Sequence, residues 1–298
     1  MSAERVGGRQ QAVGSTRMGG SGYVGPARAR VERLIPSVLY RGVLVLVLAF
    51  VAAPIVVVFL SSVNSSQYLR FPPEGFSTRW WVAALSERWM VPTWFSLRLA
   101  AATAITATVF GTLAALGVHR GRFRGREAFL AVLLSPLILP QIVTGAALLQ
   151  FFKLAGLGDV LGFPALLMGH VVVTLPYAVR TVMVSLHGFD PRLEWAAQDL
   201  GASPLQTFWR VTLPLIKNGV FAGAVFAFIV SFNDVPISLF LGRPGNVPIP
   251  IAILGQVESR FDPAVSAVAV VTIAIVLALI AVGERFARVS EFIYQQER

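Results

Sequence analysis

The sequence has no cysteine among its 298 residues, and only 13% of them are charged. The lack of cysteine excludes disulfide bonds, thiol catalysis and metal sites built from cysteine. A soluble domain carries about 25% charged residues, so the low charge points to an integral membrane protein. We find no catalytic constellation and no metal-ligand spacing in the sequence. The chain is therefore not expected to be an enzyme or to hold a metal or cofactor.

Lysine is also rare and occurs only at Lys153 and Lys217. A P-loop that binds nucleotide needs a glycine-rich turn and then a lysine followed by serine or threonine. Leucine follows Lys153 and asparagine follows Lys217. The chain is therefore not expected to bind ATP.

Hydrophobic residues make up 55% of the chain and gather in long runs. A membrane-spanning helix needs about 20 apolar residues. Six runs qualify, the fifth being interrupted by Asp234: 42–60, 99–119, 128–152, 160–186, 218–241 and 263–283. We therefore predict an all-α integral membrane fold of six transmembrane helices, surrounded by the lipid bilayer.

The formal net charge is +10, and an excess of arginine precedes the first run, at positions 5, 9, 17, 28, 30, 33 and 41. Basic residues before a first span hold that end in the cytoplasm. The segment before the first span is longer than the basic part of a cleaved signal peptide. Its Gly, Arg, Ser and Gln content predicts disorder. We therefore expect a disordered cytoplasmic leader over 1–41, a six-span domain over 42–286 and a cytoplasmic tail over 287–298. Nucleic acid is not an expected partner, because no folded pattern surrounds these arginines.

The loops agree with cytoplasmic termini. The loop after the second span is expected inside, and it carries arginine at 120, 122, 124 and 126. The loop between the third and fourth spans is expected outside and carries only Lys153 and Asp159. This bias follows the positive-inside rule. Trp89 and Trp94 are expected in an aromatic belt at the outer end of the second span.

The segment 190–216, on the expected cytoplasmic side, predicts a helical hairpin. Asp190 and Pro191 are typical of an N-cap and a first helical residue. Gly201 would end that helix, because glycine accepts the left-handed conformation. Residues 203–206 form a capping-box pattern that starts a second helix, and Pro214 is expected to close it.

Two interpretations of this hairpin follow from its residues. Trp195, Phe208 and Trp209 would let it rest on lipid headgroups as a short amphipathic element. Alternatively, a rigid hairpin would transmit force to a soluble partner, with Phe208 and Trp209 as apolar anchors. The small residues Ala196, Ala197, Gly201 and Ala202 would allow that partner to approach closely.

The stretch "EWAAQDLGASPLQTFWRVTLP" resembles the EAA loop of the membrane-spanning subunits of binding-protein-dependent ABC importers. The matching residues are Glu194, Ala196, Ala197, Gly201, Leu213 and Pro214, with Trp195 as an insertion into the motif. The resemblance implies the type I importer permease fold, with this hairpin as the coupling helix that docks on an ATPase. It also implies that separate ATPase subunits bind the ATP. The other implied partners are a second permease subunit and an extracytoplasmic solute-binding protein, at the bacterial inner membrane.

"SFNDVPISLFLGRPGNVPIPIAI" and "DPAVSAVAVVTIAI" resemble the corresponding regions of spermidine/putrescine permeases. This resemblance implies a polyamine as the transported solute and a second permease that is a different chain. Those relatives often carry two acidic residues in the fifth span, where this chain has Asn233 and Asp234. Iron, thiamine, phosphate or an amino-acid-like solute remains an alternative cargo.

Asp234 is the main ionisable residue expected at membrane depth, where charges are costly and usually functional. With Ser231 and Asn233 it would line the path of a cationic substrate. Alternatively, it would pair with an arginine of the second permease and shape the outer gate. An ion-coupled secondary transporter using Asp234, or a membrane scaffold, is the alternative outside the importer class. His170 is expected to be a buried hydrogen-bonding residue, since no second histidine stands at metal-ligand spacing.

Overall fold

The computed structural model describes residues 26–67, 72–259 and 262–295, with side chains described from 39 to 281 inside those ranges. Residues 1–25 of the expected leader and the last three residues of the expected tail lie outside the described residues. The chain divides into two compact units, residues 1–55 and 56–298.

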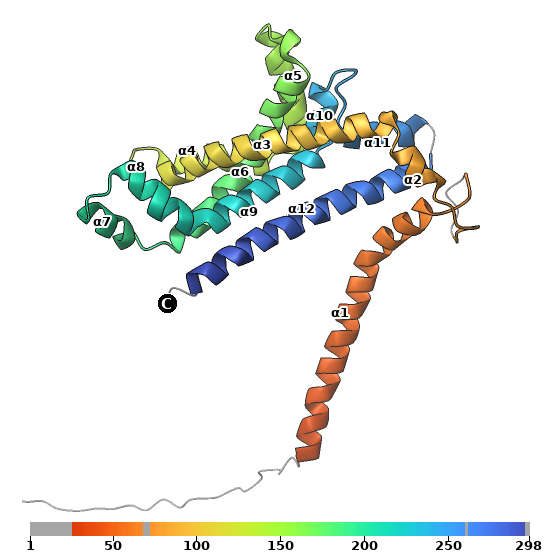
Figure 1. The fold of residues 1–298 in the computed structure, drawn as a ribbon, viewed down its shortest axis with the longest axis horizontal. Coiled ribbons are helices and arrows are strands. Elements are labelled where there is room, and N and C mark those ends of the chain that lie inside the picture. Colours follow the sequence, from red (N-terminus) through yellow and green to blue (C-terminus); the bar gives the residue numbers. More distant parts are fainter. Residues whose placement is uncertain (1–25, 68–71, 260–261, 296–298) are drawn as a thin grey trace, which may run out of the picture. The chain divides into compact units, whose positions relative to one another are not determined.

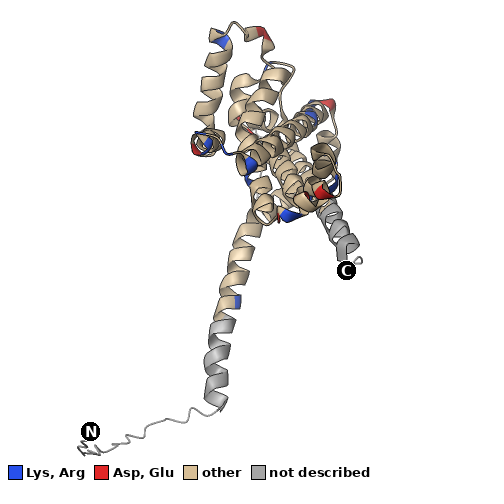
Figure 2. Ribbon diagram, turned by 90° about the vertical axis from the view of Figure 1, so that its left-hand side faces the viewer, with Lys and Arg blue, Asp and Glu red and all other residues tan. Residues whose placement is uncertain are grey.

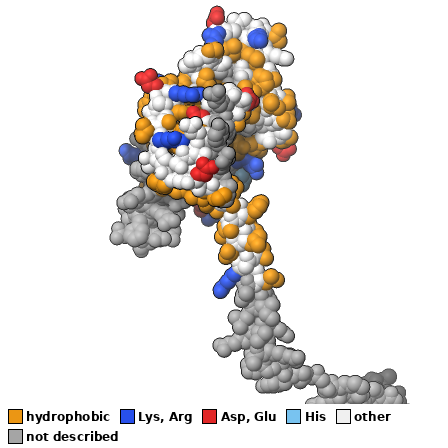
Figure 3. All heavy atoms as spheres, turned by 90° about the vertical axis from the view of Figure 1, so that its right-hand side faces the viewer, with side chains coloured by type: hydrophobic (Ala, Val, Ile, Leu, Met, Phe, Trp, Pro, Cys, Tyr) orange, Lys and Arg blue, Asp and Glu red, His pale blue; other side chains and the backbone are white. Residues whose placement is uncertain are grey.

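Most of the helix α1 (Pro26–Ser62) belongs to the first unit. The helix contains the whole first predicted span, 42–60, and begins upstream of it, within the expected leader. Figure 3 shows hydrophobic side chains along the described part of this helix. Its segment Leu39–Ser62 is long and apolar enough to cross a membrane.

The second unit is built from helices. They are α2 (Arg79–Ala84), α3 (Glu87–Arg120), α4 (Arg126–Leu134), η1 (Ser135–Leu137), α5 (Gln141–Leu154), η2 (Gly158–Val160), α6 (Phe163–His187), α7 (Arg192–Asp199), α8 (Pro204–Thr207), η3 (Phe208–Thr212), α9 (Leu213–Phe232), α10 (Pro236–Leu241), α11 (Ile249–Ser259) and α12 (Ala264–Gln295). Helices α3, α6 and α9 pack against one another, and α12 lies beside α9 (Figure 1). Most charged residues lie at helix ends or in connections (Figure 2).

Small residues bring the three central helices together. Ala178 of α6 is fully buried between Gly111 of α3 and Gly223 of α9. A Cβ atom on Gly111 would lie 2.6 Å from the Cβ of Ala178, and one on Gly223 would lie 3.0 Å from its Cα. Membrane helices associate through such close packing, because the surrounding lipid is as apolar as the side chains.

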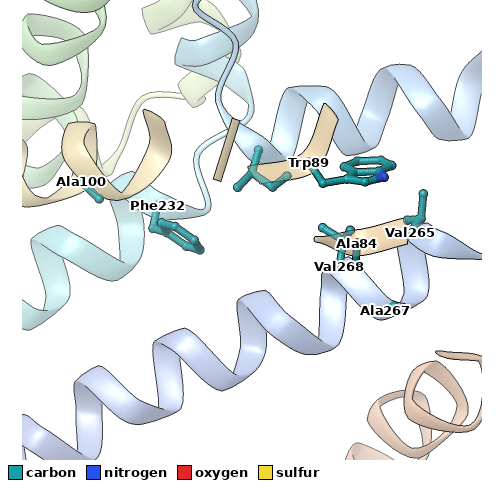
Figure 4. Packing of buried hydrophobic residues seen from close by; sticks show 8 residues of the cluster. Ala84, Trp89, Ala100, Phe232, Val265, Ala267 and Val268 are labelled. Carbon is teal, nitrogen blue, oxygen red and sulfur yellow. The ribbon is translucent and has the colours of Figure 1, made fainter. Parts of the chain in front are cut away.

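A second apolar cluster joins α2, α3 and α12. Trp89 is 3% exposed and packs with Ala84, Val265 and Val268 (Figure 4). The predicted place of Trp89 in an interfacial belt is therefore wrong. An indole buries a large apolar area, and here the neighbouring helices cover it instead of lipid headgroups.

The third predicted span is sharply bent. Its two parts, Arg126–Leu137 and Gln141–Leu154, meet at 106°. Pro140 stands at the N-cap of α5 with an extended ψ of 124°. Proline has no N–H to continue a helix and disfavours helical backbone in the residue before it. Among the described residues, five helices can each cross a membrane, and the bent pair would make a sixth span. The predicted all-α membrane fold is confirmed.

The fifth predicted span is shorter than expected at its far end. Helix α9 stops at Phe232, and α10 begins again at Pro236. The predicted span over 218–241 is therefore broken where its apolar run is interrupted by Asp234, and residues 233–235 form a break, which we call the span-five break. Pro236 explains the interruption, since it cannot donate the hydrogen bond that a continuous helix requires.

Candidate functional site

The hairpin of α7, α8 and η3 lies beyond the ends of α3 and α6, at the start of α9 (Figure 1). Asp190 Oδ1 accepts the backbone N–H of Arg192 at 3.0 Å, which is a capping contact at the start of α7. The helix begins at Arg192, one residue later than predicted. Helix ends shift by a residue or two according to how the last turn is counted.

Gly201 ends α7 as predicted. Its φ is +88°, in the left-handed region. The N–H of Gly201 donates to the carbonyl of Gln198 at 2.9 Å, and that of Ala202 donates to Ala197 at 3.0 Å. This pair of bonds is the Schellman motif, which satisfies the last carbonyls of a helix. The turn is therefore defined by backbone geometry that glycine accepts most easily.

The second helix starts with the predicted capping box. The backbone N–H of Gln206 donates to Ser203 Oγ at 3.3 Å, and the N–H of Ser203 donates to Gln206 Oε1 at 2.9 Å. Pro214 does not close this helix, so that prediction is wrong. A π-helical turn over Phe208–Thr212 leads directly into α9. The wider turn accommodates the missing N–H and the ring of Pro214, so the hairpin continues into the fifth span.

The outer side of α7 is apolar and exposed. Leu193, Ala196, Ala197 and Leu200 follow helical spacing along one face. Ala197 is half-buried, Leu193 and Ala196 are exposed, and Leu200 is 90% exposed. Trp195, Leu205 and Trp209 add further exposed apolar side chains to the hairpin. A rigid element that leaves its apolar face uncovered by its own chain is suited to contact another surface.

Glu194 lies on the side of α7 that contacts the rest of the chain. Its side chain is only 13% exposed and forms an ion pair with Arg120 at the end of α3. Thr212 Oγ1, in η3, donates to the same carboxylate oxygen. Sequence reasoning missed Arg120 and Thr212, because no local signal separates this arginine from three others in the same loop. Leu213 and Pro214 are half-buried at the start of α9.

The predicted path residues meet at the span-five break. Asn233 is exposed, and its Nδ2 donates to the carbonyl of Ile229 at 2.9 Å. Asp234 is 4% exposed, and its Oδ1 accepts the N–H groups of Ile237 and Ser238 at 2.9 and 3.0 Å. Asp234 therefore caps α10, while Asn233 faces outward.

His170 of α6 contacts a serine on each side of this break. Its Nδ1 lies 2.8 Å from Ser231 Oγ, and its Nε2 lies 3.1 Å from Ser238 Oγ. The prediction of a buried hydrogen-bonding histidine is confirmed. Within the described residues, no group of three or more His, Cys, Asp or Glu side chains is placed to hold a metal ion. The break is thus a small polar cluster inside an apolar bundle.

The described residues thus form a helical membrane fold of five candidate spans, or six with the bent pair, in which a capped hairpin precedes the fifth predicted span. Residues 107–292 match the family described as binding-protein-dependent transport system inner membrane component. The chain belongs to this family, whose members are the permease subunits of ABC importers.

Two relatives from Escherichia coli (strain K12) are similar along most of their length. The chain is 33% identical to the spermidine/putrescine transport system permease protein PotC over 256 residues, which cover 86% of this chain and 96% of PotC. It is 33% identical to the putrescine transport system permease protein PotI over 235 residues, covering 76% and 83% of the two chains.

Solved structures agree on the fold. A chain of a bacterial ABC transporter involved in the import of alginate matches with a TM-score of 0.68 and 16% identity, over 86% of this chain and 98% of that one. A chain of the MetNI methionine transporter matches with a TM-score of 0.51 and 21% identity, over 69% and 99%. The fold is therefore that of an ABC importer permease.

Proposed function

We propose that this chain carries a polyamine, such as spermidine or putrescine, across the bacterial inner membrane as one permease of an ATP-driven importer. The observation that supports a polyamine as the transported solute is the 33% identity to PotC over 86% of the chain. The polar span-five break, with Asn233 exposed and a carboxylate directly behind it, is compatible with a cationic solute.

In this proposal the hairpin docks on a separate ATPase subunit that binds and hydrolyses the ATP. The exposed apolar stripe of α7 supports this docking, since apolar side chains form the centres of interfaces. Ala196 and Ala197 let the ATPase surface approach, and Gly201 sets the angle between the two helices. Leu213 and Pro214 pass the motion into the fifth span, because the hairpin continues into α9.

The proposed substrate path runs past Ser231, Asn233 and Asp234. Asn233 offers the exposed amide. Ser231 and Asp234 lie behind it and meet His170. In this arrangement the path would be lined at the break by Asn233, with the negative charge of Asp234 next to it to attract a cation and Ser231 helping to hold the shape of the wall.

The arrangement in the membrane is also a proposal. Both termini face the cytoplasm, the leader covers 1–41, the permease domain covers 42–286 with its coupling loop at 190–216, and the tail covers 287–298. The second permease is a different chain, and an extracytoplasmic binding protein delivers the solute. Arginine at 120, 122, 124 and 126 supports this orientation.

The test starts from the affinity-tagged full chain purified from its native membrane. An ATPase and a second permease should co-purify with it. The complex is then reconstituted in vesicles together with the soluble binding protein, and uptake of radiolabelled spermidine and putrescine is measured. Uptake should require ATP. Uptake driven by an ion gradient alone would support a secondary transporter, and ATP-driven uptake of only a different solute would replace the polyamine cargo.

A further inference from the structure

Three elements of the bundle meet at a single carboxylate oxygen. Glu194 Oε1 accepts hydrogen bonds from Arg120 Nη2 and from Thr212 Oγ1. Arg120 Nη2 also donates to Thr212 Oγ1 at 3.2 Å, which closes a triangle of contacts. We call these three residues the Glu194 joint.

The members of the joint belong to three different elements. Arg120 is the last residue of α3, which is the second span. Glu194 lies in the first turn of α7, on the hairpin. Thr212 is the last residue of the π-helical turn that leads into α9, the fifth span. The joint therefore links α7 directly to α3 and to the π-helical turn that continues into α9.

Burial shows that the joint faces the bundle. Thr212 is fully buried, the Glu194 side chain is 13% exposed and the Arg120 side chain is 43% exposed. Leu193, Ala196 and Leu200 of the apolar stripe are exposed, whereas the Glu194 carboxylate is held by Arg120 and Thr212 and has little surface left for a partner. A partly buried carboxylate that has lost much of its water needs such donors, and a charged donor strengthens the bond.

The position of Arg120 at the end of α3 also favours its positive charge. Its side chain sits at the C-terminus of a long helix, where the carbonyl groups favour a cation. The guanidinium has several donors in a fixed plane, so it can contact Glu194 and Thr212 together. A displacement of α7 therefore pulls on α3 through Arg120 and on α9 through Thr212.

We propose that Arg120 is a positioning residue that converts movement of the hairpin into a joint movement of the second and fifth spans. Glu194 accordingly acts within the chain, through Arg120 and Thr212, instead of as a contact to the ATPase. This inference rests on the proposed function, because it requires the hairpin to receive force from an ATPase.

The experiment compares variants of the full chain in the purified, reconstituted complex. They are Arg120→Ala, Arg120→Lys, Thr212→Val, Glu194→Gln and the double variant Arg120→Ala with Glu194→Gln. Arg122→Ala is the matched control, since Arg122 lies exposed in the same loop. Each preparation is assayed for co-purified ATPase, for ATP hydrolysis and for solute carried per ATP hydrolysed.

Arg120→Ala should retain the co-purified ATPase and carry at least tenfold less solute per ATP. Arg120→Lys should lose less transport than Arg120→Ala, because lysine keeps the positive charge. Transport should still fall short of the unaltered chain, because lysine lacks the planar guanidinium that contacts Glu194 and Thr212 together. The double variant should be no worse than the more severe single variant, since both remove one joint. Arg122→Ala should match the unaltered chain.

Two results would overturn the inference. An unchanged ratio of solute to ATP in Arg120→Ala would show that the joint does not transmit force. Loss of the ATPase from the Arg120→Ala and Arg120→Lys complexes would make the joint part of docking instead. If the proposed importer function is wrong, the result is distinguishable from both of these, because the unaltered chain would then co-purify with no ATPase.

Discussion

His170 Nε2 lies 3.6 Å from Asp234 Oδ1, although the two residues come from α6 and from the span-five break. Both side chains are almost fully buried. The ring of His170 also reaches a serine on each side, Ser231 of α9 and Ser238 of α10. The broken fifth span is thus held together by one side chain of the fourth, which satisfies polar groups that would otherwise be costly inside an apolar bundle.

His170→Ala should therefore destabilise the protein. The substitution removes the imidazole that contacts the hydroxyls of Ser231 and Ser238 and lies beside Asp234, and a buried polar group left unsatisfied costs about 1–3 kcal/mol. We expect a lower midpoint of thermal aggregation for the purified chain, measured by size-exclusion chromatography after heating. His187→Ala is the control, because His187 is exposed at the end of the same helix. Equal midpoints for the two variants would contradict the role given to His170.

Asp234→Asn separates the charge of Asp234 from its capping contacts. An amide oxygen can still accept the N–H groups of Ile237 and Ser238, which the carboxylate now accepts. Among the described residues, the second carboxylate oxygen, Oδ2, has no hydrogen-bond partner, so its replacement by an amide breaks no existing bond.

For this variant we expect uptake of a cationic solute to fall about tenfold, because an interaction with a charged group contributes roughly 1.5–3 kcal/mol. The thermal midpoint should stay close to that of the unaltered chain. Normal uptake would mean that Asp234 serves the break only as a helix cap. Asn233→Ala is a useful comparison, since it removes an exposed amide and no charge.

The hairpin could be predicted closely from the sequence because its determinants are local. The capping box joins Ser203 to Gln206, and the left-handed turn depends on Gly201 alone. Both features act within one helical turn, where sequence spacing translates directly into geometry. Pro214 misled the prediction for the opposite reason. Whether a proline ends a helix or follows a widened turn depends on the backbone before it.

The contacts that hold the hairpin to the bundle could not be predicted in the same way. Arg120 and Glu194 are far apart in the chain and meet only because α3 and α7 end at the same side of the bundle. The loop offers arginine at 120, 122, 124 and 126, and their spacing gives no reason to choose one. For Asp234, the sequence indicated an unusual buried charge but not the capping role that α10 provides.

Gly201→Ala should impair transport without preventing membrane insertion. Gly201 has φ +88°, and a left-handed residue with a Cβ costs about 1–2 kcal/mol. The strain would tilt the two helices of the hairpin. Gly125→Ala is a matched control, because Gly125 has φ +85° and equally open space around its missing Cβ, yet lies in another loop. We expect ATP-dependent uptake to fall several-fold for the first variant only. Similar losses in both would show that strain in any loop is enough.

Gly219→Ala should destabilise the contact between α9 and α6. A Cβ on Gly219 would lie 2.6 Å from the carbonyl oxygen of Thr181, which is a backbone atom that cannot rotate away. Overpacking of this kind costs about 1–3 kcal/mol. Gly117→Ala is the control, because nothing lies within 4 Å of its missing Cβ. The thermal midpoint should drop for Gly219→Ala and stay unchanged or rise for Gly117→Ala. Equal midpoints would contradict close packing at this helix pair.

The orientation of the hairpin can be tested with single cysteines, since the chain has none of its own. Leu200→Cys places a thiol at a position that is 90% exposed on α7. Asp159→Cys places one on the loop before α6, where the side chain is fully exposed. A membrane-impermeant maleimide should label Cys at 159 in intact spheroplasts and Cys at 200 only in inverted vesicles. Bound ATPase should slow labelling at 200, because the apolar stripe would be covered. Labelling of position 200 from outside would place the hairpin away from any cytoplasmic ATPase and would remove the physical basis of coupling.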